Sequence, residues 1–359
     1  MSIDFSTDRW QRVCENYARW WEGRLDRPLI HLTITGRDPG RPEPPLKKEL
    51  FTAFYDWSVS ARDIVDRWDY DLSTLEFLGD AFPSVWPNFG PGVAAAFLGA
   101  ELHADGRTCW FRPREVRDIM ELKLPYRTDS LWLRRIEEIC RAAMERWEGL
   151  VQVGMTDLGG TLDILSTFRP GERLLLDLYD APAEVKRLTW EIHEAWWRYF
   201  QKIDAVLRPP NPGYTAWTPI FSETPYYMLQ CDFSYMIGPD MFQEFVMPEL
   251  RASCKRLDHA FYHLDGPGAL PHLESLLSIP ELRGIQWVPG EGHPECTHWP
   301  EVYRRIHAAG KLIQIWGDMR TLGTILEQIG SKAGVIIFSS VDRSERRSAI
   351  DFLEKYGAR

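Results

Sequence analysis

Short apolar runs, separated by amphipathic segments of helix length, recur along most of the chain. The runs have the length of buried strands and lie at residues 29–34, 71–77, 151–155, 214–217, 260–264, 284–288, 312–316 and 335–339. Strands that alternate with helices predict a parallel sheet, because parallel strands need long crossover connections. Eight such repeats favour an α/β fold in which one (β/α)8 TIM barrel forms, rather than an open doubly wound sheet.

Other segments interrupt this repeat, and we expect all of them to belong to one domain over residues 1–359. Residues 1–26 predict a helical extension with an aromatic face, and residues 46–67 predict a second helix. Residues 78–125 are irregular and predict an insertion with a hairpin turning at Asp105-Gly106, a favoured type I′ pair. The long segment 172–207 predicts two helices that are broken near Ala181-Pro182.

Composition and charge exclude several classes of protein. The net charge is −10 and no long Lys/Arg run occurs, which argues against nucleic-acid and acidic-membrane partners. No apolar run reaches the ~18 residues of a membrane span, and the N-terminus lacks the apolar core of a signal peptide. The six cysteines are scattered without a CxxC pair. These features predict a cytoplasmic protein in a reducing compartment.

Polar residues follow the predicted strands, and in a barrel the carboxyl ends of the strands hold the active site. The 16 Trp are an unusual number, and aromatic rings make good pocket walls as well as good core. We expect four of these residues to contact a small-molecule substrate: Glu223, Trp287, Trp316 and Asp318.

Two pairs of residues leave adjacent predicted strands with metal-binding side chains. His263-x-Asp265 and Glu291-x-His293 each place two such side chains at positions i and i+2. In an extended strand these positions point to the same side, so each pair can offer two ligands to one metal ion. Imidazole with carboxylate suits Zn, Fe or Mn. The structural alternative is a hydrogen-bonded His–Asp pair that closes one end of the barrel.

The chain lacks the standard catalytic and nucleotide-binding motifs that would indicate another function. The chain has no GxGxxG, GxxxxGK[ST], GxSxG or HExxH sequence. A nucleophile elbow is therefore missing, which disfavours a serine hydrolase. The glycine-rich stretch at residues 88–92 does not have the setting of a dinucleotide-binding fingerprint.

Several segments resemble a known family. They are 27–37 (RPLIHLTITGR), 77–80 (FLGD), 154–168 with 178–182 (LYDAP), 232–248 (DFSYMIGPDMFQEFVMP) and 261–266 (FYHLDG). In these segments the chain resembles the uroporphyrinogen decarboxylase superfamily, which includes zinc methyltransferases that act on cobamide cofactors. The similarity extends over nearly the whole chain, and 232–248 is its most specific part.

The resemblance implies a divergent enzyme of the methyltransferase branch. It implies a divalent metal such as zinc on His263 and Asp265, completed by Glu223, Glu291 or His293, and a corrinoid carried by a partner protein. Asp265 stands where the methyltransferases carry Cys, which favours an oxygen-bearing substrate over a thiol. The resemblance also implies catalytic roles for Arg37, Asp80 and Asp232, and a homodimer.

Two alternatives use other residues. A decarboxylase without metal would hold pyrrole-like nitrogens at Asp80 and a substrate carboxylate at Arg37. A carbohydrate-binding or glycoside-hydrolysing barrel would stack sugars on its Trp-rich mouth and use paired carboxylates such as Glu223 and Glu291. Bound metal would distinguish the methyltransferase from the decarboxylase, and quenching of Trp fluorescence by sugars would favour the third reading.

Overall fold

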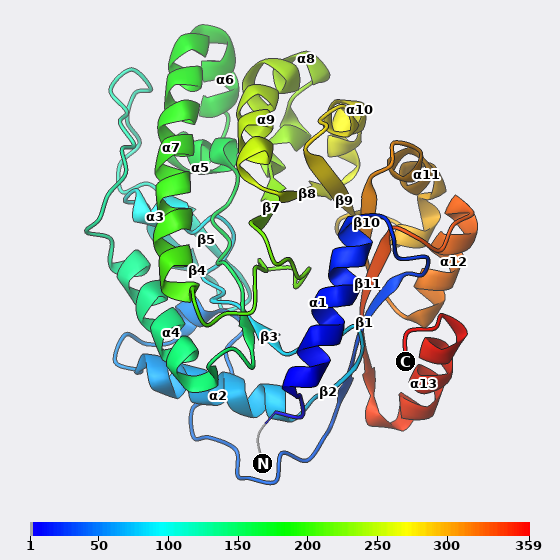
Figure 1. Ribbon diagram of the computed structural model, residues 1–359. Coiled ribbons are helices and arrows are strands. Elements are labelled where there is room, and N and C mark those ends of the chain that lie inside the picture. Colours follow the sequence, from blue (N-terminus) through cyan, green and yellow to red (C-terminus); the bar gives the residue numbers. More distant parts are fainter. Residues whose placement is uncertain (1–2) are drawn as a thin grey trace.

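A seven-stranded sheet forms the centre of the molecule, and the computed structural model describes residues 3–359 of the chain (Figure 1). The strand order is β2-β1-β11-β10-β9-β8-β7; β2 is antiparallel to β1, and every other neighbouring pair is parallel. The strands of this sheet are β1 (Leu29–Thr35), β2 (Glu76–Gly79), β7 (Tyr226–Gln230), β8 (His259–Asp265), β9 (Leu282–Val288), β10 (Leu312–Trp316) and β11 (Val335–Asp342). The predicted α/β class with a mostly parallel sheet is therefore confirmed, and these pairings alone do not close the sheet into a ring.

Two smaller sheets accompany the central one. Strands β3 (Ser84–Val85) and β6 (Gln152–Val153) form a parallel pair. Strands β4 (Glu101–Ala104) and β5 (Cys109–Arg112) form the predicted hairpin. The predicted type I′ turn was wrong, because only Gly106 of the Asp105-Gly106 pair has the positive φ that such a turn needs at both residues. The Asp105 carboxylate instead accepts hydrogen bonds from the Arg107 and Thr108 amides.

Helices connect the strands and cover the sheet. Ser60 and Ser130 begin α2 and α4 by accepting an amide hydrogen three residues later, and Asp318 caps α12 in the same way. The helices are α1 (Thr7–Trp21), α2 (Ala61–Ser73), α3 (Ala94–Phe97), α4 (Leu131–Trp147), α5 (Thr161–Phe168), α6 (Arg173–Asp180), α7 (Pro182–Leu207), α8 (Pro239–Met241), α9 (Met247–Arg256), α10 (Leu273–Leu277), α11 (Pro300–Ala308), α12 (Met319–Ile329) and α13 (Arg346–Lys355). The break that was predicted near Ala181-Pro182 separates α6 from α7, with Pro182 in the first turn of α7.

Helix α1 packs its aromatic face across the amino ends of β7 and β8, and in Figure 1 it lies in front of the sheet. The Trp21 ring stacks on His259, the first residue of β8, with ring centroids 4.1 Å apart. Trp20 stacks on Phe261 of the same strand. The predicted N-terminal helix is confirmed, and it forms part of the core rather than an appendage.

Three sequence predictions were wrong in detail. Residues 46–60 are mostly irregular, and the second helix begins only at Ala61, after the Ser60 cap. The run 71–77 contains the end of α2 and the start of antiparallel β2. The run 214–217 makes only an isolated bridge between Tyr214 and Ser222, and the strand of the main sheet is β7, at Tyr226–Gln230. The strand at 226–230 was not predicted.

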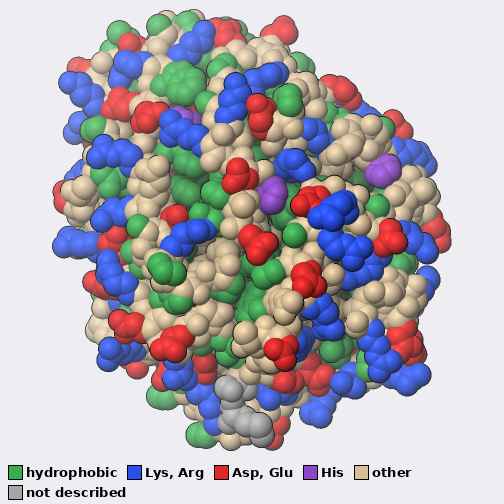
Figure 2. All heavy atoms as spheres, viewed as in Figure 1, with side chains coloured by type: hydrophobic (Ala, Val, Ile, Leu, Met, Phe, Trp, Pro, Cys, Tyr) green, Lys and Arg blue, Asp and Glu red, His purple; other side chains and the backbone are tan. Residues whose placement is uncertain are grey.

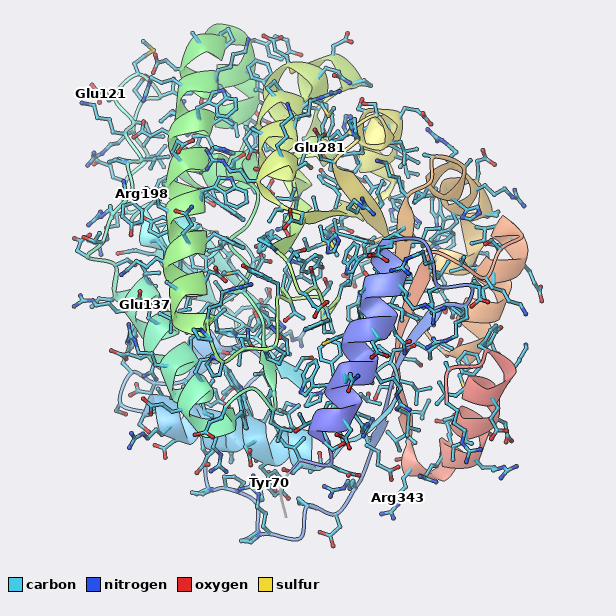
Figure 3. The ribbon with its side chains drawn as sticks, viewed as in Figure 1. Tyr70, Glu121, Glu137, Arg198, Glu281 and Arg343 are labelled. Carbon is cyan, nitrogen blue, oxygen red and sulfur yellow. The ribbon has the colours of Figure 1, made fainter. Side chains whose placement is uncertain are left out.

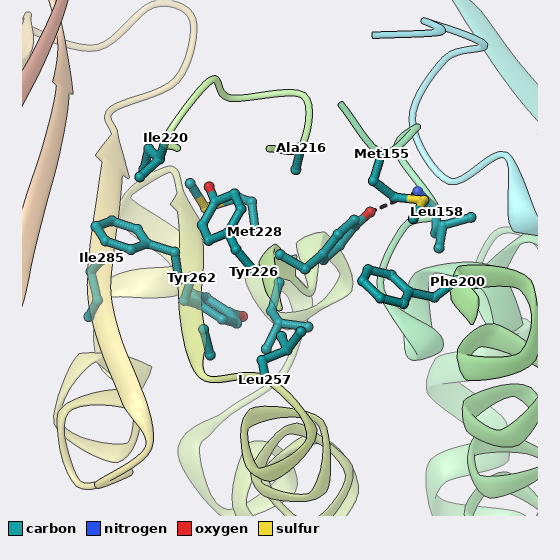
Figure 4. Packing of buried hydrophobic residues seen from close by; sticks show 14 of the residues in the cluster. Met155, Leu158, Phe200, Ala216, Ile220, Tyr226, Met228, Leu257, Tyr262 and Ile285 are labelled. Atoms are coloured by element: carbon teal, nitrogen blue, oxygen red, sulfur yellow. Dashed lines mark hydrogen bonds between the residues drawn. The ribbon is translucent and has the colours of Figure 1, made fainter. Parts of the chain in front are cut away.

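One continuous hydrophobic cluster extends through the described chain, from Ile3 to Ala358. Figure 4 shows part of it, where Tyr226 and Met228 of β7 lie beside Tyr262 of β8 and Ile285 of β9. A hydrogen bond from the Leu158 amide to the buried Tyr227 hydroxyl (2.8 Å) joins the segment after β6 to β7.

Charged side chains link the outer elements and are mixed over the surface. Glu137 of α4, labelled in Figure 3, lies 3.2 Å from the Lys202 ammonium of α7. On the face that carries α1, Figure 2 shows acidic and basic side chains interspersed. No helix among residues 3–359 is both long enough and apolar enough to cross a bilayer.

Candidate metal centre at the carboxyl ends of the strands

Three metal-binding side chains converge at the carboxyl ends of β7 and β8. They are Asp232, two residues after β7, and His263 and Asp265 at the end of β8, and their ligand atoms all lie within 4.8 Å of one another. Within residues 3–359 this is the one group of three such side chains that meets this condition. The i, i+2 spacing on β8 turns both side chains to one face, as the sequence predicted.

His263 presents a neutral ring nitrogen to the two carboxylates. Its Nδ1 donates to Oε1 of Gln286 on β9, so Nε2 carries a lone pair and lies 3.9 Å from Asp265 Oδ2. Burial lowers the pKa of His263, which favours the neutral imidazole that metal ions bind. The indole of Trp217 packs edge-on against the His263 ring at 5.1 Å.

The carboxylates around this point are crowded. Asp232 has surface open to solvent at the mouth, yet surrounding protein, Asp157 and Asp265 together raise its pKa to about 7. Burial raises the pKa of Asp157 to about 7, and burial with the nearby Asp232 raises that of Asp163 to about 7. Carboxyl groups with raised pKa values repel one another when they ionise. A divalent cation bound between them would relieve this repulsion.

Asp163 positions the segment that carries Asp232. Near the start of α5, its carboxylate accepts hydrogen bonds from the amides of Asp232 (3.0 Å) and Phe233 (2.8 Å). Gly160 precedes the helix because a Cβ there would stand 2.3 Å from the Gln230 carbonyl oxygen, so α5 and the end of β7 lie in direct contact. The α5 terminus thus fixes one ligand relative to the two on β8.

The donor set fits a divalent cation. A neutral imidazole and two carboxylates are ligands that Zn, Mn and Fe accept. Zinc bonds to these atoms measure about 2.0–2.2 Å, so ligand atoms around one ion lie no more than about 4.4 Å apart. His263 Nε2 and Asp265 Oδ2, which are 3.9 Å apart, already lie within this range.

A cavity of about 600 Å³ opens beside the cluster, at the carboxyl ends of β9 and β10. Three of the predicted substrate residues, Trp287, Trp316 and Asp318, line it. Its wall includes Val288, which is the strand partner of Asp265. Another cavity, of about 620 Å³, lies between α4 and residues 113–127, away from these groups, so size alone does not locate the site.

Asp80 and Arg37 are not brought to the cluster. Asp80 lies at the amino end of β1, because its amide donates to the Ile30 carbonyl and its buried carboxylate pairs with Arg27. Arg37 follows the carboxyl end of β1, but it donates to the Ser73 carbonyl (2.6 Å) at the end of α2. The sequence placed Asp80 at the mouth on the expectation of a parallel second strand, whereas β2 runs antiparallel.

The remaining predicted residues divide between the two ends of the sheet. Glu223 lies before β7, at the amino edge, and lines a separate cavity with Cys14 and His259. Glu291 and His293 are exposed in the loop after β9 and do not belong to the three-residue group. The register error at 214–217 explains the displacement of Glu223, which was expected to follow a strand and instead precedes one.

Sequence reasoning missed Gln286, the hydrogen-bond partner of His263. A signal was present: Ile285-Gln286-Trp287 and Ile313-Gln314-Ile315 each place one amide in the middle of an apolar strand. Asp163 was noted as a polar residue after a strand, but its hold on Asp232 depends on tertiary structure.

The chain matches no protein-family model and no curated protein sequence. The geometry of the site therefore carries the functional argument.

Proposed function

We propose that this chain is a metal-dependent enzyme, a divergent relative of the methyltransferase branch of the uroporphyrinogen decarboxylase superfamily. The convergence of Asp232, His263 and Asp265 within 4.8 Å, at the carboxyl edge of a parallel sheet, is the observation that carries this proposal. A divalent ion on these residues would act as a Lewis acid toward an oxygen-bearing substrate.

The fold that this proposal needs is a distorted (β/α)8 barrel, and backbone hydrogen bonds support it. The amide of Asp80 donates to Ile30 of β1, and that of Gly154 donates to Val85 of β3. The amide of Met155 then donates to Thr215. These contacts attach the residue after β2 to β1, the residue after β6 to β3, and residue 155 to residue 215, and they support our proposal that these segments form the remaining side of a barrel.

The chain's own residues have separate tasks in this scheme. Asp232, His263 and Asp265 bind the ion, and Asp163 holds the segment that bears Asp232. The cavity next to Val288, with Trp287 and the half-exposed Trp316 in its wall, accommodates the small substrate. The methyl acceptor in this proposal is a corrinoid on a partner protein, approaching the open carboxyl edge.

The two alternative readings receive less support from the geometry. The decarboxylase would use Asp80, but the Asp80 carboxylate is occupied by Arg27, Asn16 and the Ile30 amide at the amino edge. The glycosidase would pair Glu223 with Glu291, and these lie at opposite ends of the sheet.

Metal binding is the first test. The purified protein is dialysed against a chelator and then titrated with Zn²⁺, Mn²⁺ or Co²⁺, while bound metal and melting temperature are measured. We expect one ion per chain and a higher melting temperature, both lost in His263→Ala, because an ion that binds only the folded state must stabilise it. Failure of every ion to bind, or equal binding by His263→Ala, would overturn the proposal.

Methyl transfer is the second test. Free cob(I)alamin replaces the partner corrinoid, and formation of methylcobalamin from a panel of small O-methyl and N-methyl compounds is followed by absorbance. Product that depends on both the ion and His263 supports the methyltransferase. Loss of substrate carboxylate as CO2 without methylcobalamin would instead support the decarboxylase.

A further inference from the structure

His263, Gln286 and Gln314 form a row across three adjacent strands. His263 of β8 is in register with Gln286 of β9, which is in register with Gln314 of β10. Neighbours in register on parallel strands point to the same face and are about 4.8 Å apart. Asp265 lies two residues beyond His263 on β8 and therefore nearer to the carboxyl edge of the sheet. The row thus forms a polar layer within the apolar interior, just inside the proposed metal centre.

Both amides in this row are completely buried and incompletely bonded. Gln286 and Gln314 have 0 % exposed surface. Gln286 uses Oε1 to accept from His263 Nδ1, whereas its Nε2 and both polar atoms of Gln314 have no partner within the described residues. Packing alone favours an apolar side chain at such positions, because a buried polar group without a partner is destabilising.

We propose that Gln286 is a positioning residue, which keeps the hydrogen of His263 on Nδ1 and leaves the Nε2 lone pair facing Asp232 and Asp265. This inference rests on the proposed function and concerns one residue of its site. A neutral imidazole has a single N–H, and the hydrogen bond made by one ring nitrogen determines whether the other can bind metal. The edge-on contact of Trp217 holds the ring in this orientation.

The reverse orientation of the amide has the opposite consequence. If Gln286 turned its Nε2 toward the ring, that group would donate to His263 Nδ1, and the ring hydrogen would move to Nε2. Nε2 would then donate to a carboxylate and could not bind a metal ion. The two arrangements are distinguishable in the metal-free protein.

Three substitutions separate positioning from packing. Gln286→Leu keeps the approximate volume and removes the acceptor, and Gln286→Glu keeps an acceptor oxygen beside Nδ1. Gln314→Leu is the matched control, since Gln314 is equally buried in the same row but makes no hydrogen bond with His263. Affinity for Zn²⁺ or Co²⁺ is measured for each variant by competition with a chelator.

We expect Gln286→Leu to weaken metal binding by about 10–100-fold, the usual effect of losing a hydrogen-bond partner behind a metal-binding His. Gln286→Glu should restore most of this loss, and Gln314→Leu should bind like the wild type. Equal affinity of the wild type and Gln286→Leu would overturn the inference, as would an equal loss in Gln314→Leu, because the effect would then reflect packing of the row.

The hydrogen position gives an independent readout. Nitrogen NMR of metal-free protein labelled with 15N-histidine, assigned with His263→Ala, reports which ring nitrogen carries hydrogen. We expect hydrogen on Nδ1 in the wild type and a shift toward the other tautomer in Gln286→Leu. Hydrogen on Nε2 in the wild type would overturn the inference even if metal binds, whereas absence of metal binding alone would overturn the proposed function.

Discussion

The Arg27 guanidinium and the Asp80 carboxylate meet in a two-point ion pair at the amino end of β1. Nη1 lies 2.7 Å from Oδ2, and Nη2 lies 2.9 Å from Oδ1. The same carboxylate accepts from the Ile30 amide and from Asn16 of α1, and its residue is 1 % exposed. The pair therefore ties α1, the start of β1 and the end of β2 into one unit.

Breaking this pair should destabilise the protein severely and leave the metal centre intact. Asp80→Ala leaves the guanidinium without a partner, and removing one member of a buried ion pair costs about 3–5 kcal/mol. Urea denaturation measures this loss. Arg346→Ala, which removes a half-exposed partner of Glu76, should cost only about 0–1 kcal/mol. A similar small effect for both variants would contradict a structural role for Asp80.

His293 should contribute little to metal affinity. It is exposed in the loop after β9 and lies outside the group formed by Asp232, His263 and Asp265. We expect His293→Ala to bind Zn²⁺ within about threefold of the wild type, whereas His263→Ala loses binding; isothermal titration calorimetry compares them. A large loss in His293→Ala would show that the loop moves onto the ion.

The buried carboxyl of Asp157 should make stability fall as the pH rises. Burial raises its pKa from 3.8 to about 7. Below about pH 4 the carboxyl is protonated in both the folded and the unfolded state. Between about pH 4 and 7 only the unfolded state releases the proton, so the free energy of unfolding decreases until about pH 7. Asp157→Asn cannot ionise and keeps an acceptor for the Gly159 amide. We expect a flatter profile and a gain at pH 8 of at most about 4 kcal/mol.

Asp318 provides the control of opposite sign. Hydrogen bonds from the Thr321 amide and hydroxyl lower the pKa of Asp318, so its contribution to stability is present at neutral pH and is lost as the pH falls through the folded-state value. Asp318→Asn should therefore be less stable than the wild type at pH 7 and approach it in acid. Melting temperatures of Asp157→Asn and Asp318→Asn are compared with the wild type between pH 3 and 8. If the two variants differ from the wild type in the same way with pH, the opposite pKa shifts assigned to Asp157 and Asp318 are wrong.

Two of the six thiols should react in the native protein. Cys14 and Cys296 are half-buried, and the other four cysteines are buried. Burial raises the pKa of Cys14 to about 11 and also raises that of Cys296, so both react slowly at pH 7 and faster at pH 9. Mass spectrometry after maleimide treatment should find two labels, and six after denaturation. Cys296→Ser should lose the label in the cavity beside Trp316.

The sequence predicted the C-terminal half of the sheet well, because its strands are apolar and separated by clear helices. The runs 260–264, 284–288, 312–316 and 335–339 all lie within β8 to β11. Prediction was weaker from residue 46 to 230. The run 151–155 does contain β6, but antiparallel β2 and the two-residue strand β3 give little pattern, and the irregular turn at Tyr214–Ser222 has the composition of a strand.

The candidate site was predictable where it depended on local spacing. His263 and Asp265 lie two residues apart on one strand, so their common face follows from the strand period alone. Their meeting with Asp232 depends on which strands are neighbours, and the displacement of Asp80 depends on a reversal of strand direction. Neither property is encoded in a short stretch of residues.

The position of α1 also has a consequence for the order of folding during synthesis. Trp21 donates to the Phe221 carbonyl, Trp20 stacks on Phe261, and the Trp21 carbonyl accepts from Arg283. Trp20 and Trp21 of α1 therefore find these partners only after residues some 200–260 positions later in the chain have been synthesised. The indole rings of Trp20 and Trp21 therefore stay without these partners until well over half of the chain has been synthesised, which makes this segment a natural binding site for a chaperone.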